Sequence, residues 1–132
     1  MKRDDIGLLL LRIGLGGIFV WFGIDKFFHP IPWSKYMPEW FSSMLPTEPA
    51  TFMYVMGVFE LIVGLAVLLG IYARLAALIS AVFLLGIIAG LGLVNEVAAR
   101  DASILMLALG IAMLGPGNLS IGENIFKKKR YG

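Results

Sequence analysis

Two ionisable side chains lie inside apolar segments that are long enough to cross a lipid bilayer. Arg12 falls within residues 6–28, and Glu60 is the ionisable residue in the middle of residues 51–72. A charged side chain inside hydrocarbon costs about 2.5 kcal/mol or more unless it reaches the interface or finds a partner. We therefore expect Arg12 and Glu60 to meet as a buried pair. Such a pair can exchange protons with a ligand or can act as structure alone, and the sequence leaves both roles open.

The polar and small residues of both segments are spaced so that they share one helical face. In residues 6–28, steps of three or four residues connect Arg12, Gly16, Phe19, Gly23 and Lys26. In residues 51–72, the same steps connect Gly57, Glu60 and Gly64. Small residues let two membrane helices approach closely, so these faces should pack against each other.

Asp101 lies where a fourth apolar helix should begin. We expect it to cap that helix, because an aspartate at a helix start accepts hydrogen bonds from free amides and complements the helix dipole. The alternative is that Asp101 joins Lys26 and Asp25 in a polar cluster at the outer mouth of the bundle. A lysine at a helix end usually extends to the interface, which is the simpler role for Lys26.

The composition places these residues in a membrane protein. Of the 132 residues, 59% are hydrophobic, and the mean hydropathy is +0.87, far above the level of soluble domains. Four helices are expected at about 6–28, 51–72, 75–94 and 98–116, and the first lacks the pattern of a cleavable signal. The sequence therefore predicts one all-α domain over residues 1–132, a transmembrane antiparallel four-helix bundle.

The connection over residues 29–50 is rich in proline and aromatic residues. Its five prolines prevent one continuous helix, although Pro38 can start a short helix over Glu39–Leu45. Tryptophan and tyrosine favour the headgroup zone, so we expect this loop to lie at the outer membrane interface. A lid over an opening between the helices is the alternative.

The distribution of positive charge predicts the orientation. Four crossings put Lys2, Arg3, Arg74 and the basic tail of residues 118–132 on one side of the membrane. The positive-inside rule then predicts a multi-pass protein of the plasma membrane with both termini in the cytoplasm. The tail suits anionic lipid better than nucleic acid, because few aromatic residues are interleaved with its lysines.

Several kinds of site are excluded by the residue types. The sequence has no cysteine and one histidine, His29, so this chain alone can supply neither a thiolate centre nor a two-histidine haem site. The glycines at 14, 16 and 17 lie inside an apolar helix and do not form a nucleotide-binding loop. We expect no metal or haem bound by this chain alone, so redox chemistry would need a bound organic molecule or a partner.

The pattern of residues resembles the DoxX family of small four-helix membrane proteins, including its DoxD relatives. In the first two helices the resemblance is carried by Arg12-x3-Gly16-x2-Phe19-x3-Gly23-x2-Lys26-Phe27 and by Phe59-Glu60-x3-Gly64-x5-Gly70-x3-Arg74-x-Ala76-Ala77. Asp101 and Gly115-Pro116-Gly117-x2-Ser120 extend it to the fourth helix. The long aromatic loop departs from the usual form of the family.

The resemblance implies a link to oxidoreductases, since relatives include a membrane subunit of a thiosulfate:quinone oxidoreductase. It predicts a quinone, not covalently bound, at a polar site formed by Arg12 and Glu60 with Lys26 and Asp101, lined by Phe19, Trp21 and Phe59. The alternatives are a structural or assembly subunit of a larger membrane complex, or a transporter of small molecules or lipids. The expected partners are the lipid bilayer and, in addition, either another protein in a membrane complex or further copies of this chain.

Overall fold

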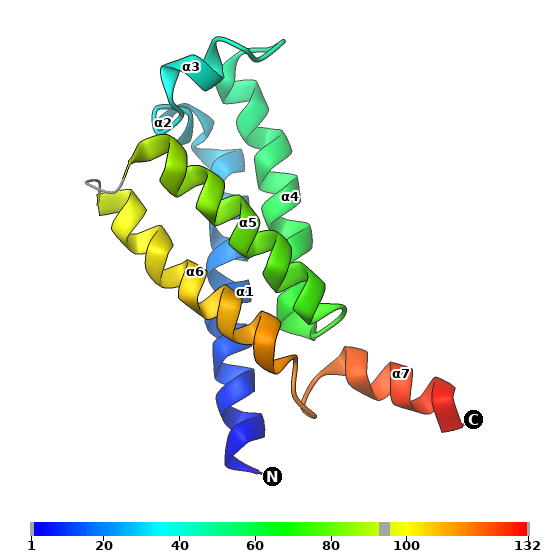
Figure 1. Cartoon of the computed structure of the whole chain (residues 1–132). Coiled ribbons are helices and arrows are strands. Elements are labelled where there is room, and N and C mark those ends of the chain that lie inside the picture. The colour runs from blue at the N-terminus through cyan, green and yellow to red at the C-terminus, as the bar shows by residue number, and fades with distance from the viewer. Residues whose placement is uncertain (1, 93–95, 132) are drawn as a thin grey trace.

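The structure is a computed structural model that describes residues 2–92 and 96–131. These residues include four helices long and apolar enough to cross a membrane: α1 (Arg3–Phe28), α4 (Pro49–Leu69), α5 (Ala73–Leu91) and α6 (Glu96–Leu114). The four helices run alternately in opposite directions along one bundle (Figure 1). The predicted all-α transmembrane four-helix bundle is confirmed.

The helices end close to the predicted positions, and glycines explain the differences. Helix α4 stops at Leu69 and not at residue 72, because Gly70 takes the left-handed conformation, with φ of 71°. Gly115 ends α6 in the same way, with φ of 87°. Helices α1 and α6 begin slightly earlier than predicted. The predicted end of the third helix at residue 94 lies outside the described residues, within which α5 ends at Leu91.

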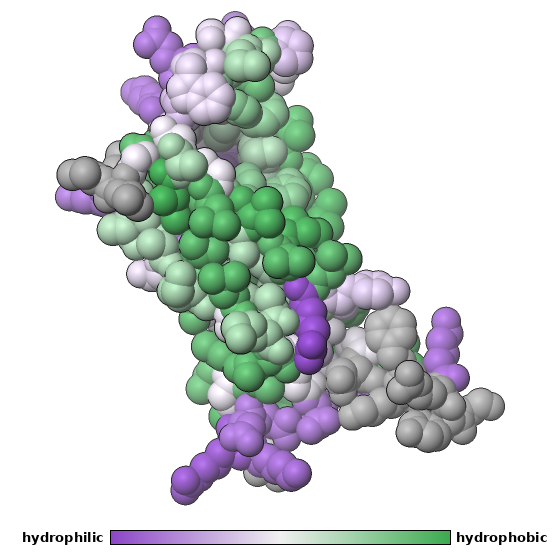
Figure 2. Space-filling view, in the orientation of Figure 1, coloured by the Kyte–Doolittle hydropathy of each residue, from purple (hydrophilic) through white to green (hydrophobic). Residues whose placement is uncertain are grey.

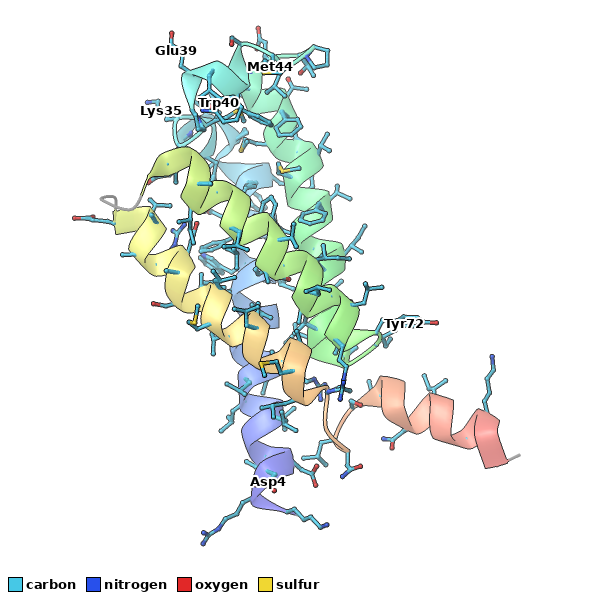
Figure 3. All side chains as sticks on the ribbon, in the orientation of Figure 1. Asp4, Lys35, Glu39, Trp40, Met44 and Tyr72 are labelled. Carbon is cyan, nitrogen blue, oxygen red and sulfur yellow. The ribbon has the colours of Figure 1, made fainter. Side chains whose placement is uncertain are left out.

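The connection between α1 and α4 forms two short helices, α2 (Pro30–Ser34) and α3 (Glu39–Ser42). Proline occupies the first position of α2 and precedes α3, as its fixed φ favours. The short helix predicted after Pro38 is therefore present, although it ends at Ser42. Both helices cover one end of the bundle (Figure 1), where Trp40 and Met44 are exposed (Figure 3).

Helices α1 and α4 approach each other closely at two pairs of glycines. A Cβ atom built on Gly16 would lie 2.8 Å from the carbonyl oxygen of Gly64, and one built on Gly23 would lie 2.8 Å from that of Gly57. No side chain fits at either contact. The predicted packing of the two glycine-bearing faces is confirmed.

The basic tail contains a further helix, α7 (Ile121–Tyr131), which the sequence analysis did not predict. It starts against the α4–α5 turn, since a Cβ atom on Gly122 would collide with the carbonyl oxygen of Gly70. Beyond that contact α7 projects from the bundle, at the end that also holds the N-terminus (Figure 1). Between the two ends the visible surface is a band of hydrophobic residues (Figure 2), as contact with a lipid bilayer requires.

Candidate functional site

A cavity of about 500 Å³ lies between the four membrane-spanning helices at the end covered by α2 and α3. Most of its lining side chains are aromatic or aliphatic. Among the described residues, its charged lining side chains are Lys26, Glu60, Arg100 and Asp101. An apolar cavity with a few converging polar groups is the usual form of a small-molecule site.

Lys26 and Glu60 form a buried ion pair on one wall of the cavity. The Lys26 Nζ atom lies 2.7 Å from Glu60 Oε2 and 3.0 Å from Oε1, so the ammonium donates to both carboxylate oxygens. The two residues are 5% and 3% exposed. The sequence analysis favoured a Lys26 side chain that extends to the interface. That prediction is wrong, because Glu60 binds the Lys26 ammonium inside the bundle.

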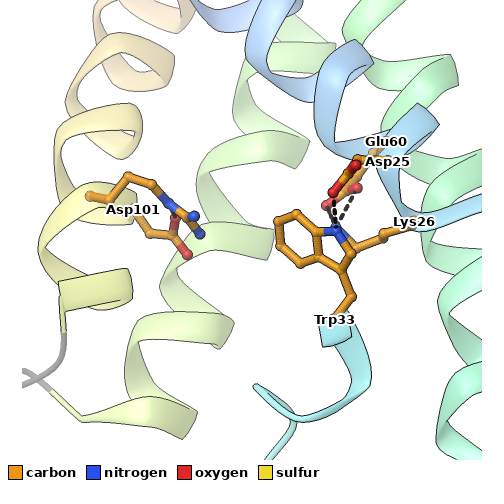
Figure 4. Close-up of polar contacts among 6 residues, drawn as sticks. Asp25, Lys26, Trp33, Glu60 and Asp101 are labelled. Atoms are coloured by element: carbon orange, nitrogen blue, oxygen red, sulfur yellow. Dashed lines mark hydrogen bonds and ion pairs between the residues drawn. The ribbon is translucent and has the colours of Figure 1, made fainter. Parts of the chain in front are cut away.

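Arg100 and Asp101 form a second ion pair, on α6, that also lines the cavity; Figure 4 shows Asp101 on the other side of Trp33 from Glu60. The Arg100 Nε atom donates to Asp101 Oδ1 at 3.0 Å, and Asp101 is 2% exposed. The predicted capping role of Asp101 is wrong, because α6 begins at Glu96, more than one turn earlier. The alternative prediction, a polar cluster shared with Lys26, describes its position better, since both residues line one cavity.

Two aromatic rings lie between the positive charges. The Lys26 Nζ atom is 3.7 Å from the centroid of the Trp33 ring, and the Arg100 Cζ atom is 4.7 Å from that of Phe22. These are cation–π distances. The Phe22 and Trp33 rings also contact each other edge to face, with centroids 5.1 Å apart. Both cations are thus in contact with the same pair of aromatic rings.

Trp33 belongs to α2 and is fixed to the end of α1. Its indole Nε1 donates to Asp25 Oδ2 at 2.7 Å, and Asp25 Oδ1 lies 2.9 Å from His29 Nδ1 (Figure 4 shows Asp25 and Trp33). Asp25 was predicted as a possible member of the polar cluster, and it holds the aromatic cover of the cavity instead. Other residues of the 29–50 connection also line the cavity, namely Tyr36, Met37, Pro38, Trp40 and Phe41.

Arg12 does not pair with Glu60, so that prediction is wrong. Its guanidinium donates to the carbonyl oxygens of Val67, Leu68, Pro116 and Leu119. Val67 and Leu68 belong to the last turn of α4, and Pro116 and Leu119 come after the end of α6. Helix ends leave carbonyl groups without partners inside the helix, and a planar cation with five N–H donors can satisfy several of them. Arg12 is 2% exposed and lies at the opposite end of α1 from the cavity.

The three predicted aromatic residues take different positions. Phe19 is 2% exposed and lines the cavity as expected. Trp21 is 65% exposed on the outer face of α1 and does not line it, so its predicted place in the slot is wrong. Phe59 is absent from the lining as well, and its ring supports the lining residue Phe83, with centroids 5.0 Å apart.

The sequence analysis did not identify Phe22, Trp33 or Arg100 as site residues. A signal for Arg100 was available, because Asp101 next to it begins an apolar segment and a buried carboxylate requires a cation. A signal for Trp33 was the aromatic content of its loop, which we had assigned chiefly to the membrane interface. For Phe22 the signal was the helical spacing itself, since it lies three residues after Phe19 and four before Lys26.

The arrangement supplies two kinds of chemical group inside an apolar enclosure. The cations can donate hydrogen bonds to ligand oxygens, and the carboxylates can accept or release protons. Within the described residues, no group of three or more histidine, aspartate or glutamate side chains is placed to hold a metal ion. Such a site can bind a largely apolar small molecule that carries hydrogen-bond acceptors.

Comparison with known proteins places the chain in a family. The sequence model of the DoxX family matches residues 7–95. A Bacillus subtilis (strain 168) protein named "Putative oxidoreductase CatD" is 31% identical over 135 residues, which cover 99% of this chain and 96% of the relative. No solved structure matches. This chain is a multi-pass membrane protein that belongs to the DoxX family.

Proposed function

We propose that this protein holds a quinone in the cavity and acts as a quinone-linked subunit of a membrane oxidoreductase complex. The observation that carries the proposal is that two ion pairs, Lys26–Glu60 and Arg100–Asp101, line one aromatic cavity of about 500 Å³. The similarity to a relative with an oxidoreductase name supports the class of reaction.

The residues of the cavity fit the chemical form of a quinone. The quinone ring would lie against Phe22 and Trp33, whose rings already make cation–π contacts with Arg100 and Lys26. Lys26 on α1 and Arg100 on α6 both contact these rings and would each donate to one of the two ring oxygens. When bound, a quinone takes up two electrons and two protons to become a quinol.

The chain's own residues would handle the protons and leave the electrons to a partner. Glu60 and Asp101 each lie beside one of the two cations, and each carboxylate would first take up a proton and then pass it to the oxygen on its side. The electrons would come from a partner that carries a redox centre, because this chain, with no cysteine and one histidine, cannot alone form a thiolate centre or a two-histidine haem site. This is why we propose a subunit and not an independent enzyme.

Quinone titration of the purified protein in lipid nanodiscs tests the proposal. Arg100→Gln removes one charged donor and should weaken quinone binding by about tenfold or more, as expected for a lost hydrogen bond to a charged group. Glu60→Gln should also weaken it. Arg74→Gln is the matched control, since Arg74 is an exposed arginine whose side chain reaches the end of α6, away from the cavity. Equal affinity in all variants, or no saturable binding by the wild type, would end the proposal.

One observation favours a second function, a structural or assembly subunit without a ligand. In the described part of the chain every fully buried side-chain nitrogen and oxygen atom already has a hydrogen-bond partner. The ion pairs therefore need no ligand for their own stability. Purification in mild detergent separates the two functions. A single chain that retains quinone supports the first, and obligate co-purification with a respiratory complex, free of quinone on this chain, supports the second.

We further propose a plasma-membrane location with both termini in the cytoplasm. Lys2 and Arg3 are at the start of α1, and Arg74 is in the first turn of α5. Both helices begin at the end of the bundle that holds the N-terminus and α7 (Figure 1). Positive charge is retained on the cytoplasmic side. The cavity would then lie in the outer half of the membrane, under α2 and α3.

A further inference from the structure

The cavity is bordered on one side by two facing stripes of residues, one from α4 and one from α5. The α4 stripe consists of Phe52, Met53, Met56 and Glu60. The α5 stripe consists of Val82, Phe83, Gly86, Ile87 and Gly90. Both follow helical spacing, so each presents a continuous edge along the cavity.

Two residues of the α5 stripe lie on the surface of the bundle as well as in the cavity wall. Val82 is 64% exposed, and Gly86 is exposed with no neighbouring atom within 4 Å of a Cβ built on it. A residue that both lines a cavity and is exposed marks where the cavity opens. The cavity therefore reaches the surface between α4 and α5.

The opening faces the lipid and not water. Helices α4 and α5 diverge from their tight turn toward the end covered by α3 (Figure 1). The surface around them belongs to the hydrophobic band of Figure 2. On the other side the cavity is covered by the aromatic residues of α2 and α3, Trp33 and Phe41 among them.

We propose that this opening is a lateral entrance from the bilayer, and that the ligand is an amphiphile with a long apolar chain. Its head would lie between the two ion pairs, and its chain would leave past Gly86 into the lipid. A cavity of about 500 Å³ is large enough for a head group and too small for a long isoprenoid chain as well. Met53 and Met56 are flexible and can adapt to the passing chain. The inference rests on the proposed function and narrows it to long-chain quinones.

Gly86→Phe tests the entrance, with Gly110→Phe as the matched control. Both glycines lie inside membrane-spanning helices with no atom within 4 Å of a built Cβ, and of the two only Gly86 lines the cavity. Binding of a long-chain quinone and of a chain-free quinone with the same head is measured in nanodiscs. We expect Gly86→Phe to weaken long-chain binding by about tenfold or more and to leave chain-free binding within about twofold. Gly110→Phe should change neither.

The outcomes separate the entrance from the site itself. Unchanged long-chain binding in Gly86→Phe overturns the entrance. Equal loss of both ligands also overturns it, because residue 86 would then obstruct the head site. Binding of the chain-free quinone alone by the wild type overturns the entrance and leaves the head site standing. If the wild type binds neither quinone, the proposed function fails and the entrance fails with it.

Discussion

The Lys26 ammonium lies 2.7 Å from the Glu60 carboxylate, inside a bundle where both residues are almost fully buried. Lys26 is near the end of α1, and Glu60 is in the middle of α4. The pair connects these helices in the half of the bundle that contains the cavity. Its energetic role can be measured apart from any ligand.

A double-mutant cycle should show strong coupling between these two residues. Lys26→Met or Glu60→Gln alone leaves one buried group without its partner and should destabilise the fold by about 3 kcal/mol or more. The double variant should recover much of that loss, because no lone charge remains. Thermal unfolding in detergent measures all four proteins. The exposed Lys35→Met is the control, and losses that simply add would contradict the coupling.

The four-helix bundle could be predicted from the sequence because its signals are strong and local. Apolar segments of sufficient length give the crossings, and the spacing of Gly16, Gly23, Gly57 and Gly64 identifies the faces that pack. The cavity could not be predicted in the same way, since it depends on how the 29–50 connection folds over the bundle. Proline and aromatic content suggested a cover without showing what lay beneath it.

The partner of Glu60 was predicted wrongly for a geometric reason. The glycine contacts Gly16–Gly64 and Gly23–Gly57 place Glu60 roughly level with Val20 on α1. Measured along α1, Arg12 is then about 12 Å from that level toward the N-terminus, and Lys26 is about 9 Å from it toward the C-terminus. Side chains lean toward the N-terminus of their own helix, so in antiparallel helices Lys26 and Glu60 lean toward each other. Arg12 leans away, toward carbonyl groups that no residue pattern in the sequence reveals.

Arg12→Gln should destabilise the bundle without a direct effect on the cavity. The change removes donors from the carbonyl groups of Val67, Leu68, Pro116 and Leu119. We expect a loss of about 3 kcal/mol, since hydrogen bonds to charged groups contribute about 1.5–3 kcal/mol each and do not add fully. Arg12→Lys should recover only part of the loss. It keeps the positive charge, but its ammonium lacks the planar fork of donors.

Chemical unfolding and quinone titration together decide the role of Arg12. A folded Arg12→Gln protein with wild-type affinity for quinone supports a structural role. A protein as stable as the wild type that has lost quinone binding would restore Arg12 to the ligand site.

The adjacent glycines Gly16 and Gly17 on α1 should respond differently to substitution by alanine. In Gly16→Ala the new methyl group meets the Gly64 carbonyl, so α1 and α4 must separate, at a cost of about 1–3 kcal/mol. Gly17 has no atom within 4 Å of a built Cβ, so Gly17→Ala should be neutral or stabilise the helix by up to about 1 kcal/mol. Unfolding of both variants in the same detergent gives the comparison. Similar values for the two would contradict the close approach.

Trp33 should control the affinity of the cavity through two separable contacts. Trp33→Phe keeps an aromatic face for Lys26 and removes the hydrogen bond to Asp25, whereas Trp33→Ala removes both. Quinone affinity should therefore fall in the order wild type, Trp33→Phe, Trp33→Ala, with each contact worth about 1 kcal/mol. Trp21→Ala is the control, because its side chain faces outward. An unchanged affinity in Trp33→Ala would remove α2 from the site.

Single cysteines can report the orientation in the membrane, because the natural sequence has none. Ser43 lies beside α3 and Lys129 lies in α7, and both side chains are exposed at opposite ends of the bundle. With both termini in the cytoplasm, a membrane-impermeant maleimide added to intact cells should label Ser43→Cys. Lys129→Cys should be labelled after the membrane is opened with detergent. The reverse pattern would put the basic end outside, against the positive-inside rule, and would turn the covered end of the cavity toward the cytoplasm.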